Sequence, residues 1–134
     1  MCTAVSYKVN DLYFGRTFDY EASYGEEIVF MPRKYPFNFR YAGNMQEHFA
    51  IIGMAHMADD IPLYYDAMNE KGLCMAGLNF VGNACYSDKH TDGDNILQFE
   101  FIPWILGQCT SVKEARQKLD RICMLSESFN DKLP

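Results

Sequence analysis

Long apolar runs are absent from the 134-residue sequence, and so is any excess of basic residues. No segment approaches the roughly 20 apolar residues that a membrane-spanning helix needs, so we expect no contact with a membrane. Lys and Arg together number 12 against 18 Asp and Glu, a net charge of -6, which argues against a nucleic-acid partner. Hydrophobic residues nevertheless make up 49% of the chain, which excludes a disordered protein and favours a packed domain.

Cysteine is scarce and irregularly spaced. The five cysteines are an odd number and include no Cys-x-x-Cys pair, so the sequence suggests neither a zinc site nor a disulfide framework. The N-terminus also carries no apolar segment of the kind found in signal peptides. We therefore expect a reducing, cytoplasmic location. In that setting, four cysteines are interpreted as small apolar residues of the core: Cys74, Cys85, Cys109 and Cys123.

Common metal and cofactor motifs are incomplete. The acidic segment that starts at Asp88 resembles a calcium loop, but Phe99 stands where a bidentate glutamate is required. The glycines of segment 77–82 have P-loop spacing, but Asn83 follows where the loop needs a lysine. The three histidines have no metal-ligand spacing. We expect no metal and no cofactor.

The first two-thirds of the chain predicts strands. The Asn10-Asp11 pair suits a tight hairpin turn, and Gly72 suits the positive φ of a second hairpin loop over 68–72. Segment 82–95 is polar and is predicted to be a loop. Short apolar or alternating segments indicate strands at 2–8, 12–20, 26–32, 49–57, 62–68 and 73–80.

The last third changes to helical patterns. An apolar segment over 95–109 predicts a helix with Pro103 in its first turn and Gly107 at its end. Ser111 and Glu114 then form a capping-box pattern that begins a second helix over 112–124. We expect the two helices to cover one face of a sheet in which 2–20 lies beside 73–80, and to bury three residues: Trp104, Leu119 and Ile122.

Strands followed by helices indicate an α+β domain. No strand follows the helices to complete the sheet, so residues 1–134 are interpreted as the N-terminal portion of a single, incomplete domain. One face of its sheet would then expose a large apolar patch, which monomers rarely tolerate. We expect either a homo-oligomer or a companion chain that carries the rest of the domain.

Cys2 becomes the N-terminal residue if Met1 is removed, and it then offers a thiol and an α-amine. An α-amine with a pKa of about 7.7–8.0 suits a general base at neutral pH. The fold would have to supply a carboxylate that orients the amine and a cation that favours the thiolate. Segment 15–19 contains both, as Asp19 and Arg16.

The hairpin register gives this hypothesis a geometry. A two-residue loop at Asn10-Asp11 would place Cys2 opposite Asp19, with Cβ atoms about 4.5–5.5 Å apart. Arg16 would then point to the other face of the strand, and it would reach the thiol only if the strand twists, bulges or ends. On these residues alone, a chance cysteine at position 2 remains an open alternative.

Four segments together resemble one family. MCTAV, YFGRTFDYE, MNEKGLCMAGLNF and FIPWILGQCTSVKEAR occur in that order, and together they are similar to the choloylglycine hydrolases. That family comprises bile salt hydrolases and penicillin V acylases, and it belongs to the N-terminal nucleophile (Ntn) hydrolases. The resemblance runs through the whole chain but covers only the N-terminal part of a family member.

The resemblance implies a four-layer αββα sandwich and a set of catalytic residues. Cys2 would be the nucleophile, Arg16 a neighbour of its thiol, and Asp19 the partner of its amine. Asn79 would help to form the oxyanion hole. A further asparagine and arginine of the family site would lie beyond Pro134.

The resemblance also implies a small-molecule amide substrate. A conjugated bile salt would release glycine or taurine, with its steroid in an apolar pocket lined by Phe18 and loop 55–62, notably Met57 and Ile61. A core position for Phe18 is an equal alternative. Asn79, rather than a tyrosine, favours bile salts over a penicillin V acylase activity. A non-catalytic fragment is the third hypothesis.

Overall fold

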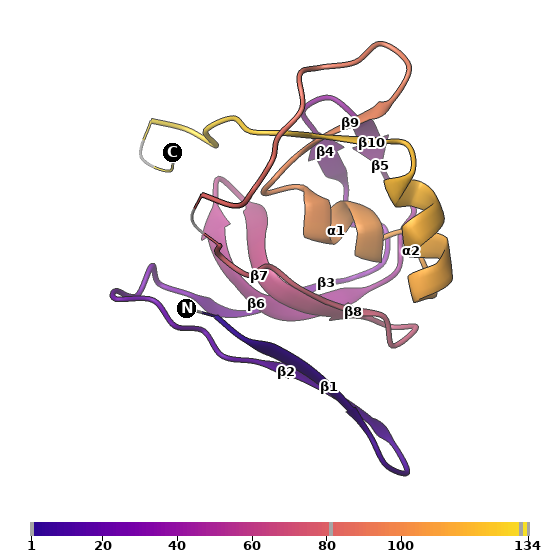
Figure 1. The fold of residues 1–134 in the computed structure, drawn as a ribbon. Helices are drawn as coiled ribbons and strands as arrows, with labels where there is room; N and C mark the ends of the chain where they lie inside the picture. The colour runs from indigo at the N-terminus through magenta and orange to yellow at the C-terminus, as the bar shows by residue number, and fades with distance from the viewer. Residues whose placement is uncertain (1, 81, 132, 134) are drawn as a thin grey trace.

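A four-stranded antiparallel sheet forms the body of the molecule (Figure 1). The computed structural model describes residues 2–80, 82–131 and 133. The sheet runs in the order β3-β6-β7-β8. Its strands are β3 (Glu27–Met31), β6 (Ile51–Ala58), β7 (Ile61–Asn69) and β8 (Cys74–Ala76). Gly72 in the loop between β7 and β8 has a φ of 83°, as its place in a predicted hairpin loop requires.

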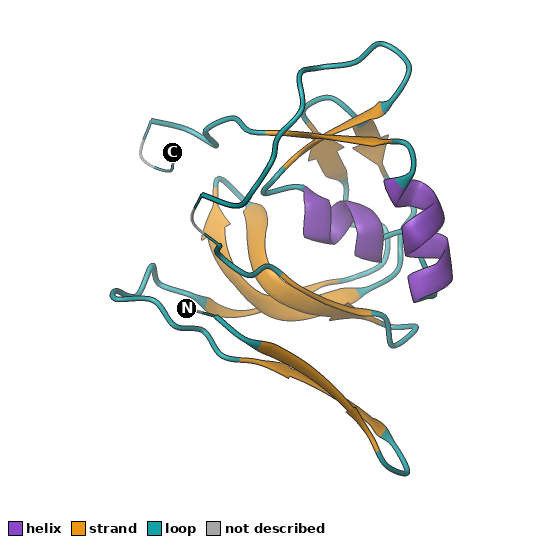
Figure 2. Cartoon of the chain, in the orientation of Figure 1, coloured by secondary structure: helices purple, strands orange, loops and turns teal. Residues whose placement is uncertain are grey.

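The two faces of this sheet differ in burial. Two helices, α1 (Phe101–Leu106) and α2 (Val112–Leu119), lie on one side of it (Figure 2). On that face the alternate strand residues are buried together with the apolar side chains of α1. This core includes Val29, Met31, Ile51, Ala67, Ile102, Trp104, Ile105 and Leu106. The opposite face exposes four large apolar side chains at 43–70% of their area: Ile28, Phe30, Ile52 and Met68.

The N-terminal hairpin lies on the exposed side of the sheet and projects from it (Figure 1). Its strands are β1 (Ala4–Lys8) and β2 (Leu12–Arg16), and among the described residues they pair only with each other. The expectation that 2–20 and 73–80 share one sheet is therefore wrong. The two segments are joined instead by a side chain, because Arg16 Nη2 donates to the carbonyl oxygen of Gly77 at 2.5 Å.

The hairpin register differs by one residue from the expected one. Ala4 pairs with Arg16, and the loop contains three residues, 9–11, rather than two. The backbone N–H of Val9 donates to the carbonyl of Asp11 at 3.2 Å inside this loop, which adds Val9 to the turn. A one-residue slip moves every side chain of one strand to the other face relative to its partner. Arg16 consequently lies opposite Ala4, on the same face of the hairpin.

Two small sheets were not expected from the sequence. β4 (Phe37–Phe39) and β5 (Gly43–Met45) form a hairpin, and β9 (Asp94–Leu97) pairs in parallel with β10 (Ile122–Leu125). The predictions that 82–95 is entirely loop and that helices cover 95–109 and 112–124 are therefore wrong at these positions. Parallel pairing buries Ile96, Leu97 and Leu125, and that tertiary contact outweighs the helical spacing of Ile122.

The helix signals themselves are confirmed. Pro103 lies in the first turn of α1, Gly107 caps its C-terminus, and the Ser111 hydroxyl accepts the N–H of Glu114. Trp104 is buried as expected, whereas Leu119 is 43% exposed because α2 buries none of its residues. Neither described helix is long and apolar enough to cross a membrane.

Candidate active site

Three of the four predicted catalytic residues line one cavity. Cys2, Asp19 and Asn79 all border a cavity of about 690 Å³. Cys2 precedes β1, Asp19 follows the end of β2, and Asn79 follows the end of β8. The ends of these elements meet there because the hairpin lies against the exposed side of the main sheet. Cys2 is only 5% exposed, so its side chain is enclosed by the surrounding residues.

Hydrogen bonds hold Asp19 beside the N-terminal segment. The hydroxyl of Thr17 donates to Asp19 Oδ2 at 2.8 Å and accepts the backbone N–H of Thr3 at 3.0 Å. The backbone N–H of Thr17 also donates to the Thr3 carbonyl at 2.8 Å. A single hydroxyl therefore connects the Asp19 carboxylate to the residue that follows Cys2. Sequence reasoning missed Thr17, although its position between Arg16 and Asp19 was the available signal.

Arg16, the fourth predicted catalytic residue, is not among the residues that line this cavity, and its guanidinium is buried. Its side chain is 6% exposed, and Nε lies 3.6 Å from Asp66 Oδ2. The guanidinium carbon lies 4.7 Å from the centre of the Phe18 ring, within the range of a cation–π contact. The observed register pairs Arg16 with Ala4 at the last position of the hairpin, whereas Cys2 lies before β1, so the role of Arg16 as a neighbour of the thiol stays a prediction.

The segment that carries Asn79 is fixed through Gly77. The backbone N–H of Gly77 donates to the Tyr65 carbonyl at 2.8 Å, and its own carbonyl accepts from Arg16. Both polar groups of one residue are thus bonded to different segments. Asn79 follows two residues later, at the wall of the Cys2 cavity.

An aromatic cavity of about 540 Å³ adjoins the first one. Tyr20 and Tyr24 border both cavities. The second is lined mainly by apolar and aromatic residues: Leu63, Tyr64, Tyr65, Phe99, Phe129 and Leu133, together with His56 and Gln98. Burial raises the pKa of the Tyr64 and Tyr65 hydroxyls, so both stay neutral at physiological pH. The sequence prediction missed these tyrosines, although the Tyr64-Tyr65 pair was a visible signal.

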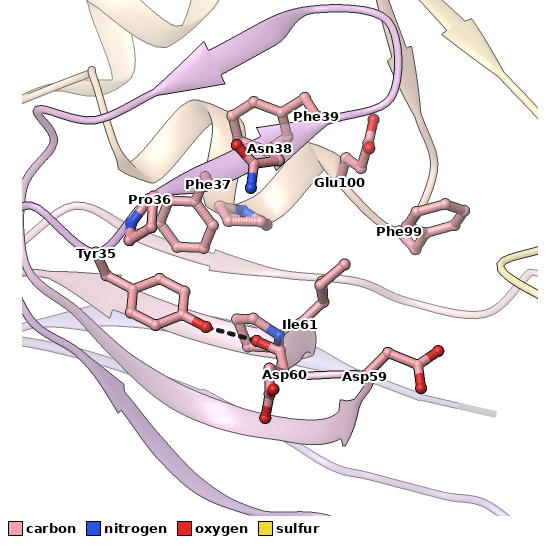
Figure 3. Close-up of a pocket in the computed structure, with 12 residues that line it drawn as sticks. Tyr35, Pro36, Phe37, Asn38, Phe39, Asp59, Asp60, Ile61, Phe99 and Glu100 are labelled. Atoms are coloured by element: carbon pink, nitrogen blue, oxygen red, sulfur yellow. Dashed lines mark hydrogen bonds between the residues drawn. The ribbon is translucent and has the colours of Figure 1, made fainter.

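The three residues predicted to line a substrate pocket lie in different places. Phe18 packs against Tyr65 and Tyr20, with ring centres 4.7 Å apart in each pair. Met57 packs against the hydrophobic core. Ile61 lines a separate cavity of about 250 Å³ whose walls include aromatic rings from β4 and its flanks (Figure 3). A substrate-binding role for these three residues stays a prediction.

Of the four cysteines predicted to be core residues, Cys109 is buried, Cys74 and Cys123 are partly buried, and Cys85 is exposed, so the prediction is wrong for Cys85. All five cysteines are free. Burial raises the pKa of the Cys74 and Cys109 thiols, which disfavours their thiolates. Within the described part of the chain, no three His, Cys, Asp or Glu side chains gather in a way that could hold a metal ion.

Comparison with known proteins identifies relatives along the whole chain. A bile salt hydrolase/transferase of Lactiplantibacillus plantarum is 50% identical over 134 residues, which are all of this chain and 41% of that protein. A bile salt hydrolase/transferase of Bifidobacterium longum is 37% identical over 131 residues, which are 95% of this chain and 41% of that protein. The chain thus spans about two-fifths of the length of these relatives.

Solved structures show the same fold. The whole chain matches 42% of a variant conjugated bile acid hydrolase from Clostridium perfringens with a TM-score of 0.91 at 31% identity. The α+β class and the Ntn-hydrolase fold expected from the sequence are therefore confirmed. The family model of the linear amide C-N hydrolases, choloylglycine hydrolase family, matches residues 2–133. With its sequence matched over nearly its whole length and its fold matched over all of it, this chain belongs to the choloylglycine hydrolase family.

Proposed function

We propose that this chain carries part of the active site of an enzyme that hydrolyses the amide bond of conjugated bile salts, with Cys2 as nucleophile. The observation that supports this most directly is the cavity shared by Cys2, Asp19 and Asn79, next to an aromatic cavity. Met1, whose removal the proposal requires, lies outside the described residues.

The proposed mechanism uses both groups of an N-terminal Cys2. Its α-amine, oriented by Asp19, accepts the thiol proton while Sγ attacks the amide carbonyl carbon. Asn79 donates to the oxyanion, and loss of one such donor typically costs about 10²–10³ in rate. The amine then passes the proton to the leaving nitrogen, the C–N bond breaks, and glycine or taurine departs. Water attacks the remaining thioester and releases the free acid and the thiol.

The substrate class is inferred from the aromatic cavity and from the relatives. Its neutral tyrosines and apolar side chains suit a rigid steroid with few hydroxyls, because burial of apolar area in such a cavity is favourable. Tyr20 and Tyr24 line both cavities, so a conjugate bound in the aromatic cavity would direct its acyl carbon toward Cys2. The relatives are named bile salt or conjugated bile acid hydrolases, which favours the same substrate here.

Acyl transfer is a second candidate activity. The relatives from Lactiplantibacillus plantarum and Bifidobacterium longum are both named hydrolase/transferase. A thioester on Cys2 can be attacked by an amine in place of water, which would form a new bile acid amide and regenerate the thiol. Hydrolysis and transfer would share every step up to that point.

Two further hypotheses concern the pocket and the length of the chain. In the first, the same nucleophile would cleave the amide bond of penicillin V, which carries a different acyl group. In the second, this chain, which spans about two-fifths of the length of its relatives, would fold or associate without catalysing any reaction. The cytoplasmic location inferred from the free cysteines is also a proposal, and cell fractionation would test it.

A substrate panel tests the proposed function. The protein, with the mass of its purified chain measured to establish that it begins at Cys2, is incubated with glycocholate, taurocholate and penicillin V. Release of glycine or taurine, absent in a Cys2→Ser variant, is expected. Equal rates for chains that begin at Met1 and at Cys2 would exclude the N-terminal nucleophile, and preferential cleavage of penicillin V would exclude the bile salt assignment.

A further inference from the structure

Asp66 places a carboxylate on the face of the main sheet that exposes Ile52 and Met68. It lies in β7, in register with Met54 of β6 and Ala76 of β8. Its side chain is 23% exposed, and among the described residues its Oδ2 atom has no hydrogen-bond partner although it is shielded from solvent. A shielded carboxylate oxygen is costly unless a cation compensates it. The position of the nearest cation therefore indicates what Asp66 does.

A β-bulge directs the side chains around Asp66. The register of β6 and β7 shifts between Met54 and Ala55, and Tyr65 is the extra residue of β7 at this point. Bulges bend a strand and redirect side chains, and they are frequent near active sites. Here Tyr65 packs on Phe18, and the adjacent Asp66 approaches Arg16. The bulge thus brings two consecutive residues of β7 to the hairpin that follows Cys2.

Arg16 is held from two sides. Asp66 lies 3.6 Å from its Nε, and the Gly77 carbonyl accepts from its Nη2. In the described part of the chain, Nε and Nη1 make no hydrogen bond although they are shielded from solvent. The carboxylate of Asp66 is therefore the charge that compensates this guanidinium, and removing one partner of a buried pair leaves the other uncompensated.

We propose that Asp66 is a positioning residue that acts through Arg16. Its carboxylate holds the guanidinium in the orientation that bonds the Gly77 carbonyl, and this bond fixes the segment leading to Asn79 beside Cys2. Asp66 is not among the residues that line the Cys2 cavity, so it acts at a distance from the reacting atoms. The expected effect of Asp66 on catalysis rests on the proposed function. The positioning of segment 77–80 by Asp66 and Arg16 does not depend on it.

A double-mutant cycle with Arg16 tests the coupling in the full-length protein. Asp66→Asn is expected to lower kcat by about 10- to 100-fold with KM nearly unchanged, because small misplacements of a catalytic constellation cost that much. In an Arg16→Leu background the same change should have almost no further effect, since the group that Asp66 positions is gone. Asp66→Glu, which keeps the charge on a longer side chain, should lose less activity than Asp66→Asn.

Glu70→Gln is the matched control. It removes the carboxylate of another arginine pair, with Arg33, just after the C-terminal end of β7. It should leave kcat unchanged. Equal losses from Asp66→Asn in the parent and in the Arg16→Leu background, or no loss in either, would overturn the proposal.

Hydrogen–deuterium exchange separates this inference from the proposed function. Backbone amides of 77–80 should exchange faster in Asp66→Asn and in Arg16→Leu than in the parent. The double variant should exchange no faster than either single variant, and Glu70→Gln should exchange at the parent rate. If the parent protein hydrolyses no conjugate, the proposed function fails and this exchange pattern alone decides the role of Asp66. If Asp66→Asn does not fold, Arg16→Leu is measured in its place, because the proposal requires the same faster exchange there, and unchanged exchange at 77–80 would refute the proposal.

Discussion

The Thr17 hydroxyl makes the residue-scale contact on which the proposed general base depends. It donates to Asp19 and accepts from the Thr3 backbone, so it connects the Asp19 carboxylate to the residue that follows Cys2. This carboxylate is the group proposed to orient the Cys2 amine. Thr17→Val keeps the shape of the side chain and removes both bonds. Because a hydrogen bond to a charged group contributes about 1.5–3 kcal/mol, kcat/KM should fall roughly tenfold or more.

Thr17→Ser serves as the control for that measurement. It retains the hydroxyl, and kcat/KM of conjugate hydrolysis should stay close to the parent value. Similar losses in the valine and serine variants would show that the methyl group, and not the hydroxyl, matters at this position.

The thiols provide a second residue-scale prediction. Cys2→Ser should abolish most hydrolysis in the full-length protein, whereas Cys74→Ser and Cys109→Ser should leave it largely intact. Burial raises the pKa of the Cys74 and Cys109 thiols, so neither forms a thiolate readily at neutral pH. Rates of glycine or taurine release check this expectation. An equal loss from Cys74→Ser would contradict the assignment of the nucleophile.

At the scale of elements, Glu70 connects the ends of three strands. It follows β7, accepts the backbone N–H of Ala50 just before β6 at 2.9 Å, and forms a bidentate pair with Arg33 after β3. The Arg33 hydrogen bonds, followed by the one from Ala50, lower the pKa of Glu70 from 4.5 to about 2. The carboxylate therefore stabilises the folded state at pH values above its unfolded pKa.

This lowered pKa predicts a specific loss of stability in acid. The Glu70 contribution should be complete above about pH 4.5 and disappear progressively as pH falls toward 2. Thermal unfolding measured across this range should show a weaker pH dependence for Glu70→Gln than for the parent. Asp11→Asn, at an exposed loop carboxylate in the hairpin, should leave that dependence unchanged. Parallel curves for Glu70→Gln and the parent would contradict the assignment.

For the whole molecule, the exposed area is larger than its mass suggests. A folded monomer of 15.5 kDa is expected to expose about 7,200 Å², whereas this chain exposes 8858 Å². The excess is roughly twice the ~800 Å² that one partner buries in a standard protein–protein interface. Much of it is apolar and lies on the open sheet face and the hairpin, including Ile28, Phe30, Val5, Tyr7 and Leu12.

We therefore expect the 134-residue chain to associate with a second copy or with a companion segment that covers this face. Light scattering after size-exclusion chromatography should show species above the monomer mass. Phe30→Glu should shift the population toward monomer because it places a charge on the apolar face. Thr110→Glu, on the opposite side of the sheet, should not. A monodisperse monomer of the parent chain would refute the expectation.

Local signals in the sequence were sufficient for several features. Ser111 at a helix start, Pro103 in a first turn and Gly72 in a hairpin loop were predicted correctly because each reflects a conformational preference of a few neighbouring residues. The sequence also singled out Cys2 and Asp19, which line one cavity in the structure, and their catalytic roles stay a prediction.

Tertiary structure decided what local preference leaves open. The hairpin register moved by one residue because Val9 joined the turn, and that shift placed Arg16 opposite Ala4. The aromatic cavity and the contact of Asp66 with Arg16 depend on a bulge in β7 and on segments that are far apart in the chain. Partners of this kind are selected by burial and pairing over the whole molecule, and no short stretch of residues contains that information.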